Sequence, residues 1–190
     1  AYVCKNPSNA GHSRYGRENL DEWIDLKTYL LNGQEYLQLT QGVRDALKNL
    51  HHYCPQFAER GATLEGLIWF HGEADSQWPS KAEAYEDHLT NLIRDLRKDF
   101  GKPDLPVVVT AMASSKGKLN ADQQKVLDAQ MAVGDPEQYP EFGKNVISVD
   151  TRPMTYPENP GGRDRYASNA KSYLEIGEAM AAAMLKLLPE

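Results

Sequence analysis

The chain has 190 residues, of which 41% are hydrophobic and 25% are charged, and its formal net charge at pH 7 is −6. This length and composition predict one globular domain, residues 1–190, that buries its own hydrophobic core. The acidic balance and the lack of Lys- or Arg-rich clusters argue against nucleic-acid and anionic-membrane partners, and no apolar run reaches the length of a membrane span.

The two cysteines, Cys4 and Cys54, leave the cellular compartment open. They form one disulfide if the protein is secreted, or stay as two thiols if it is cytosolic, and their spacing does not match a metal site. Because the sequence begins with Ala1 rather than Met, as a processed product does, we expect a secreted or extracellular protein.

The predicted elements alternate between strands and helices along the chain. Residues 1–4 predict a short strand, followed by a loop rich in turn-forming residues that carries Ser8 and Asn9. Apolar residues at helical spacing then predict a helix over 34–52 that lies on a sheet. An almost uninterrupted apolar run over 64–70 predicts a buried strand.

The next helix is predicted from Pro79-Ser80 to a stop at Gly101 and is followed by a strand over 105–112. A helix over 120–133 and a strand over 145–150 come next. The chain then continues in a long surface loop over 151–168 and ends with a helix whose apolar stripe covers 173–187. This alternation implies right-handed crossovers and a mostly parallel sheet covered on both faces. The predicted fold class is therefore α/β, a three-layer α/β/α sandwich of flavodoxin-like type. No G-x-G-x-x-G, P-loop or H-E-x-x-H pattern is present, so we expect neither a nucleotide cofactor nor a zinc site.

The end of the strand over 64–70 is where we expect chemistry. The sequence there is His71, Gly72, Glu73, Ala74 and Asp75. In open α/β sheets ligands bind beyond the carboxyl ends of the strands, and a glycine amide beside an imidazole and two carboxylates suits a reactive site. The alternative is a polar strand-to-helix turn in which Asp75 only helps to start a helix.

Five motifs together resemble a known family. They are W-F-H-G-E-A-D at 69–75, Y-x-x-x-L-x-x-L-I-x-D-x-R at 85–97, D-F-G at 99–101, L-P-V-V at 105–108 and N-A-x-x-Y-x-x-I-G at 169–177. The set resembles the sialate O-acetylesterase-like carbohydrate esterases of the SGNH-hydrolase superfamily, over roughly residues 36–187.

This resemblance implies a hydrolase that removes acetyl groups from sugars without a metal or organic cofactor. In the family, a serine in a G-Q-S-N turn attacks the acetyl carbonyl, and a histidine in a late D-x-x-H element takes its proton. The implied nucleophile is Ser8, with Asn9 and Gly72 as oxyanion donors. The other candidate site residues are His71 as a substitute base, Glu73 or Asp75 as the orienting carboxylate, Asp164 as the aspartate of the D-x-x-H element and Arg165 on the substrate side.

The sequence departs from the family pattern at both catalytic motifs. The turn around Ser8 reads N-P-S-N, and the segment after it is either remodelled or missing. Where the family has its histidine, one alignment places Arg165 and the other Ala167, and neither side chain can act as a general base at neutral pH. His71 replaces the family's glutamine and is the one imidazole close to the expected site.

Two functions therefore remain open. The first is an active carbohydrate O-acetylesterase whose partner is an acetylated carbohydrate. The second is a catalytically inactive relative that binds a glycan or serves as a structural or interaction protein, because folds outlive functions. If the chain is a fragment or one half of a larger assembly, another segment supplies the missing strand and nucleophile.

Overall fold

The computed structural model describes residues 34–111, 119–154 and 169–189. The predicted strand over 1–4, Cys4, and most of the predicted loop over 151–168 lie outside these residues. Cys54 is a free, half-buried thiol.

Within the described residues, three parallel strands form a central sheet. They are β1 (Leu67–Trp69), β2 (Val107–Ala111) and β3 (Val146–Asp150), in the order β1-β2-β3. Val107 of β2 aligns with Leu67 on one side and with Val146 on the other. Every residue of the central strand β2 is buried, as its run of valines predicts. The predicted parallel α/β architecture is confirmed.

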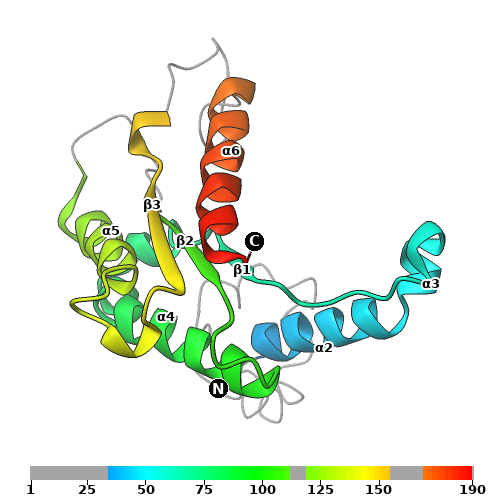
Figure 1. Cartoon of the computed structure of the whole chain (residues 1–190). Helices are drawn as coiled ribbons and strands as arrows, with labels where there is room; N and C mark the ends of the chain where they lie inside the picture. Colours follow the sequence, from blue (N-terminus) through cyan, green and yellow to red (C-terminus); the bar gives the residue numbers. More distant parts are fainter. Residues whose placement is uncertain (1–33, 112–118, 155–168, 190) are drawn as a thin grey trace, which may run out of the picture.

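Helices cover both faces of this sheet (Figure 1). The longer helices are α2 (Gln34–Lys48), α4 (Pro79–Asp99), α5 (Ala121–Val133) and α6 (Ala170–Leu187), and the short ones are α3 (Leu50–Tyr53), η3 (Pro55–Phe57), η4 (Asp75–Gln77), η5 (Pro140–Phe142) and η6 (Arg152–Met154). Helices α4 and α5 lie on one face and α6 on the other. The three-layer arrangement is therefore confirmed.

The alternation of side chains along β2 explains the two covered faces. Val107 and Val109 belong to the core cluster shared with α4 and α5, where Leu92 and Ile93 are almost completely buried. Thr110 points the other way, and its hydroxyl donates to the sulfur of Met180 in α6 at 3.0 Å. Each face of the strand thus has its own helical cover.

The helix boundaries follow local signals in the sequence. Pro79 occupies the first turn of α4, where its missing N–H is no loss, and Gly101 follows the helix with φ +62°. Helix α5 begins with a capping box between Asn120 and Gln123, and Asn169 caps α6 with its side-chain oxygen. The predicted bounds of α4 and α5 agree with the structure for this reason, while α6 begins three residues before its predicted apolar stripe.

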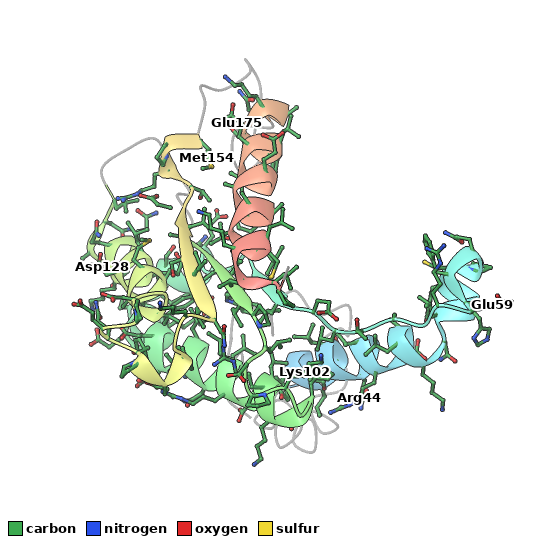
Figure 2. All side chains as sticks on the ribbon, in the orientation of Figure 1. Arg44, Glu59, Lys102, Asp128, Met154 and Glu175 are labelled. Atoms are coloured by element: carbon green, nitrogen blue, oxygen red, sulfur yellow. The ribbon has the colours of Figure 1, made fainter. Side chains whose placement is uncertain are left out.

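The predicted helix over 34–52 is wrong in two respects. It breaks at Asn49 into α2 and α3, and it does not lie on the sheet. Helix α2 contacts the end of α4: the Tyr36 hydroxyl donates to the Asp99 carboxylate at 2.6 Å, and the Arg44 guanidinium donates to the Asp99 carbonyl at 3.3 Å. Beyond Arg44 the chain forms an arm that points away from the sheet, with Arg44 and Glu59 labelled along it in Figure 2. Tyr53, near its end, is 57% exposed.

None of the helices in the described ranges is long and apolar enough to cross a membrane.

Candidate functional site

The carboxyl ends of the three strands meet at one edge of the sheet, because all three run in parallel. Strand β1 ends at Trp69 and leads directly into the loop 71–75, while β3 ends at Asp150. At the same end of the molecule lie Met154, which follows β3, and Glu175, in α6 (Figure 2). The loop 71–75 therefore occupies the edge where ligands bind in open α/β sheets.

The carbonyl oxygen of His71 accepts hydrogen bonds from two buried side chains. The Tyr85 hydroxyl of α4 donates to it at 2.9 Å, and the Gln130 Nε2 of α5 donates at 2.6 Å. Gln130 Nε2 also lies 3.2 Å from the Tyr85 hydroxyl oxygen, and both side chains are buried, at 0% and 4% exposure. We call Tyr85 and Gln130 the carbonyl clamp. It ties the end of β1 to both helices on that face of the sheet.

Gly72 is buried against the carbonyl clamp, and its position leaves no room for a side chain. Its φ is +133°, a conformation that residues with a Cβ rarely adopt. A Cβ at this position would lie 2.6 Å from Gln130 Nε2 and 3.0 Å from the Tyr85 hydroxyl. No hydrogen-bond acceptor for the Gly72 amide is found in the described part of the chain. This amide is the group that the sequence predicts as an oxyanion donor.

The rest of the loop folds back on itself in a compact turn. The Ser76 amide donates to the Gly72 carbonyl at 3.0 Å, and the Ser76 hydroxyl donates to the Glu73 carbonyl at 2.7 Å. Asp75 begins the 3-10 helix η4, but no side-chain capping bond starts that helix, and α4 begins only at Pro79. Asp75 therefore lies in the first turn of a short helix, as the alternative interpretation of this loop expects.

The Asp75 carboxylate also lies near the His71 imidazole. The distance from His71 Nε2 to Asp75 Oδ2 is 3.6 Å, and the two side chains are 34% and 14% exposed. The imidazole also packs against two aromatic rings: its centroid is 5.1 Å from that of Trp69 and 6.3 Å from that of Tyr85, whose ring is stacked nearly parallel to it. At this distance the two groups are not hydrogen-bonded, but the carboxylate attracts the imidazole electrostatically when the ring is protonated. Of the two loop carboxylates, it is Asp75 that forms this pair, while Glu73 is half-buried nearby.

The structure thus brings together four of the eight site residues that the sequence predicts: His71, Gly72, Glu73 and Asp75. The other four lie outside the described residues, and their roles stay predictions: Ser8, Asn9, Asp164 and Arg165.

The carbonyl clamp was not predicted from the sequence. From the sequence, Tyr85 is expected only as the first residue of the family motif over 85–97, and no role is expected for Gln130. A signal for Gln130 exists, since it follows the inward-facing Val126 by four residues and precedes the inward-facing Val133 by three. A polar side chain within such a buried stripe requires a hydrogen-bond partner.

A separate hollow lies between α5 and the outer side of β3. Its volume is about 600 Å³, and it is lined by Glu86, Asp128, Met131, Ala132, Gly134, Asp135, Gln138, Ile147 and Ser148. None of the loop residues 71–75 contributes to it. No group of three or more His, Cys, Asp or Glu side chains suited to a metal ion occurs among the described residues.

Comparisons with known proteins identify the family. The family model for the carbohydrate esterases described as sialic acid-specific acetylesterases matches residues 15–186. A probable carbohydrate esterase of Arabidopsis thaliana is 27% identical over 125 residues, which are 66% of this chain and 42% of that protein. An X-ray structure of an Arabidopsis thaliana protein is similar with a TM-score of 0.51 and 26% identity, over 70% of this chain and 49% of that one. The chain spans less than half the length of these relatives. Because the family model covers most of its length, the chain belongs to the sialic acid-specific acetylesterase family of carbohydrate esterases.

Proposed function

We propose that this protein is a carbohydrate O-acetylesterase whose reaction takes place at the loop 71–75. The observation that carries the proposal is the His71–Asp75 pair, with 3.6 Å between Nε2 and Oδ2, directly beside the buried amide of Gly72. An imidazole beside a carboxylate supplies a general base, and a fixed amide supplies a donor for an oxyanion. Both groups stand at the carboxyl edge of a parallel sheet.

The proposed reaction has two halves. In the first, the Ser8 hydroxyl attacks the acetyl carbonyl carbon while the His71 imidazole takes its proton, and the oxyanion is stabilised by the amides of Gly72 and Asn9. The C–O bond to the sugar then breaks, and the imidazolium protonates the departing sugar oxygen. In the second half, water attacks the acetyl-serine by the same route and releases acetate.

The remaining predicted residues have supporting roles in this proposal. The Asp75 carboxylate orients His71. Glu73 shapes the loop beside it, and Arg165 offers a permanent positive charge to the substrate. Asp164 stands in the late element from which the family takes its histidine, and a group in or near that element is the alternative base. We also propose a secreted location, where acetylated glycans are found.

A second candidate function is glycan binding without catalysis. Specific residues favour it: Arg165 or Ala167 stands where the family has its catalytic histidine. In this case the edge around Gly72 holds a sugar, and no proton acceptor is needed.

The discriminating experiment is hydrolysis of p-nitrophenyl acetate and of an O-acetylated sialic acid by the purified protein. We expect activity in the wild type and its loss to background in Ser8→Ala, with Ser80→Ala as a matched control, because Ser80 is an exposed serine at the start of α4. Activity that survives in Ser8→Ala excludes the proposed nucleophile. A folded but inactive wild type excludes the esterase, and calorimetric titration with acetylated and deacetylated sugars then tests glycan binding.

The identity of the base is tested separately by His71→Gln. We expect kcat to fall by at least about 100-fold, because general acid–base catalysis contributes about 10²–10⁴-fold. The matched control is His88→Gln in α4, which we expect to retain wild-type activity. If His71→Gln also retains activity, the base lies elsewhere.

A further inference from the structure

The carbonyl clamp acts on a single peptide group, the one that joins His71 to Gly72. Two buried donors point at its oxygen, the Tyr85 hydroxyl at 2.9 Å and Gln130 Nε2 at 2.6 Å. The atom of Gln130 that faces the carbonyl must be its nitrogen, because only the amide NH2 group can donate to a carbonyl oxygen. One peptide carbonyl thus receives donors from two different helices.

Holding the carbonyl also fixes the amide on the other side of the same peptide group. A peptide unit is planar and trans, so its C=O and N–H bonds point in opposite directions within one plane. The Gly72 N–H must therefore point away from Tyr85 and Gln130, on the side where no acceptor for it is found among the described residues. The direction of this N–H is set by the clamp.

The same two hydrogen bonds also change the strength of the donor. Hydrogen bonds to a carbonyl oxygen draw electron density from the amide nitrogen, and chains of hydrogen bonds in a low-dielectric interior strengthen one another. An amide whose carbonyl accepts two bonds is therefore a stronger donor than one whose carbonyl accepts none.

We propose that Tyr85 and Gln130 are positioning residues that aim and polarise the Gly72 amide toward the oxyanion of the reaction. This inference rests on the proposed esterase function. The clamp is well anchored for the role, since the Ser148 hydroxyl of β3 donates to the backbone carbonyl of Gln130 and holds α5 against the sheet. Through these contacts, β1, α4, α5 and β3 together hold the peptide group that carries the Gly72 N–H.

The kinetic test uses Tyr85→Phe and Gln130→Met, which keep most of the buried volume and remove the donors. We expect each to lower kcat about tenfold with little change in KM, because an oxyanion donor acts only in the transition state, and removing one outright costs about 10²–10³ in kcat. The pH dependence of kcat should keep its midpoint, since neither residue takes the proton of the Ser8 hydroxyl.

The matched control is Tyr139→Phe. Tyr139 also donates its hydroxyl to a partner on α4, the carboxylate of Glu86, but neither residue belongs to the loop 71–75. We expect this variant to keep the wild-type kcat. An unchanged kcat in both clamp variants, or an equal loss in Tyr139→Phe, overturns the inference.

A readout independent of activity is the NMR signal of the peptide group between His71 and Gly72. His71 is the one histidine in the chain that is followed by glycine. Protein labelled with 1-¹³C-histidine and ¹⁵N-glycine therefore gives a single HNCO peak, which reports the His71 carbonyl and the Gly72 amide together. We expect the carbonyl ¹³C resonance to move upfield in Tyr85→Phe and Gln130→Met and to stay in place in Tyr139→Phe.

The possible outcomes separate this inference from the proposed function. A peak that stays in place in both clamp variants overturns the inference whatever the activity. An active wild type whose clamp variants show a moved peak but an unchanged kcat also overturns it, while the esterase stands. An inactive, folded wild type overturns the esterase and with it the catalytic role of the clamp.

Discussion

At the scale of single residues, Gly72 is the position that most restricts the site. Its backbone has φ +133°, and the space that a side chain would occupy is taken by Gln130 Nε2 and the Tyr85 hydroxyl. The glycine is therefore required for two separate reasons, backbone conformation and close contact. The loop can bring its amide to the edge of the sheet only because this residue has no Cβ.

We predict that Gly72→Ala destabilises the protein by at least about 3 kcal/mol, since strain at a positive φ and a buried clash add together. Gly101→Ala is the matched control, because Gly101 has φ +62° but nothing within 4 Å of an added Cβ. Gly101→Ala should lower the unfolding free energy by about 1 kcal/mol, which is the cost of the backbone strain alone. Urea unfolding of both variants measures the difference, and equal losses would show that contact with the carbonyl clamp contributes nothing.

Glu73 provides a second test at this scale. Its carboxylate is half-buried within the loop, next to the residues proposed to act on the substrate. We predict that Glu73→Gln lowers esterase activity about tenfold or more while changing the unfolding free energy by less than about 1 kcal/mol, because glutamine keeps the size and shape of the side chain. A large loss of stability with intact activity would instead identify Glu73 as a structural hydrogen-bonding residue.

At the scale of elements, helix α5 begins at a local capping motif and carries Gln130, which contacts the loop 71–75 far away in the sequence. Its capping box at Asn120 and Gln123 fixes where the helix begins, and two and a half turns later the helix presents Gln130 to the His71 carbonyl. The capping box is readable from the sequence because all of its bonds are local. The contact of Gln130 is not, because it joins residues 59 positions apart.

We predict that Asn120→Ala lowers the unfolding free energy by about 1 kcal/mol, the usual cost of losing an N-cap. The rest of α5 stays in place through its buried residues, so kcat should not change. Gln124→Ala, at an exposed position of the same helix, is the control and should lie within about 0.5 kcal/mol of the wild type. Thermal or urea unfolding together with the ester assay checks both statements, and a fall in kcat would show that the cap itself positions Gln130.

At the scale of the whole molecule, two tyrosines connect separate parts of the chain to α4. The Tyr36 hydroxyl of α2 donates to Asp99 at 2.6 Å, and the Tyr139 hydroxyl, between α5 and β3, donates to Glu86. Burial, as the larger cause, and the hydrogen bond to Glu86 together raise the pKa of Tyr139 from 10.0 to about 12. Burial and the bond to Asp99 raise the pKa of Tyr36 as well. Both contacts need a neutral phenol.

These raised pKa values predict a loss of stability at alkaline pH. In the unfolded chain the tyrosines ionise near pH 10, before they do so in the folded protein, so their contribution is complete below pH 10 and falls as the pH rises toward 12. We expect Tm to drop over this range, and to drop less steeply in Tyr139→Phe. Tyr173→Phe, at a 45% exposed position, is the control. Identical pH profiles for wild type and Tyr139→Phe would contradict the prediction.

Much of the fold could be predicted because it depends on local pattern. The buried valines of β2, the apolar stripe of α4 and the caps at Asn120 and Asn169 each identify their element from neighbouring residues alone. The helix over 34–52 was predicted less well, since its apolar residues indicate a buried face but not which surface covers it. Tyr36 reaches the end of α4 rather than the sheet.

The sequence by itself determined the order of strands and helices, the parallel sheet, and the place of His71 to Asp75 at a strand end, because these follow from periodicity and chain connectivity. It also carried the family motifs. Only the tertiary structure decided that Asp75 rather than Glu73 pairs with His71, and that Tyr85 and Gln130 hold the His71 carbonyl. The physical reason is that such contacts depend on side-chain direction and on the packing of α4 and α5 against the sheet, which no local pattern specifies.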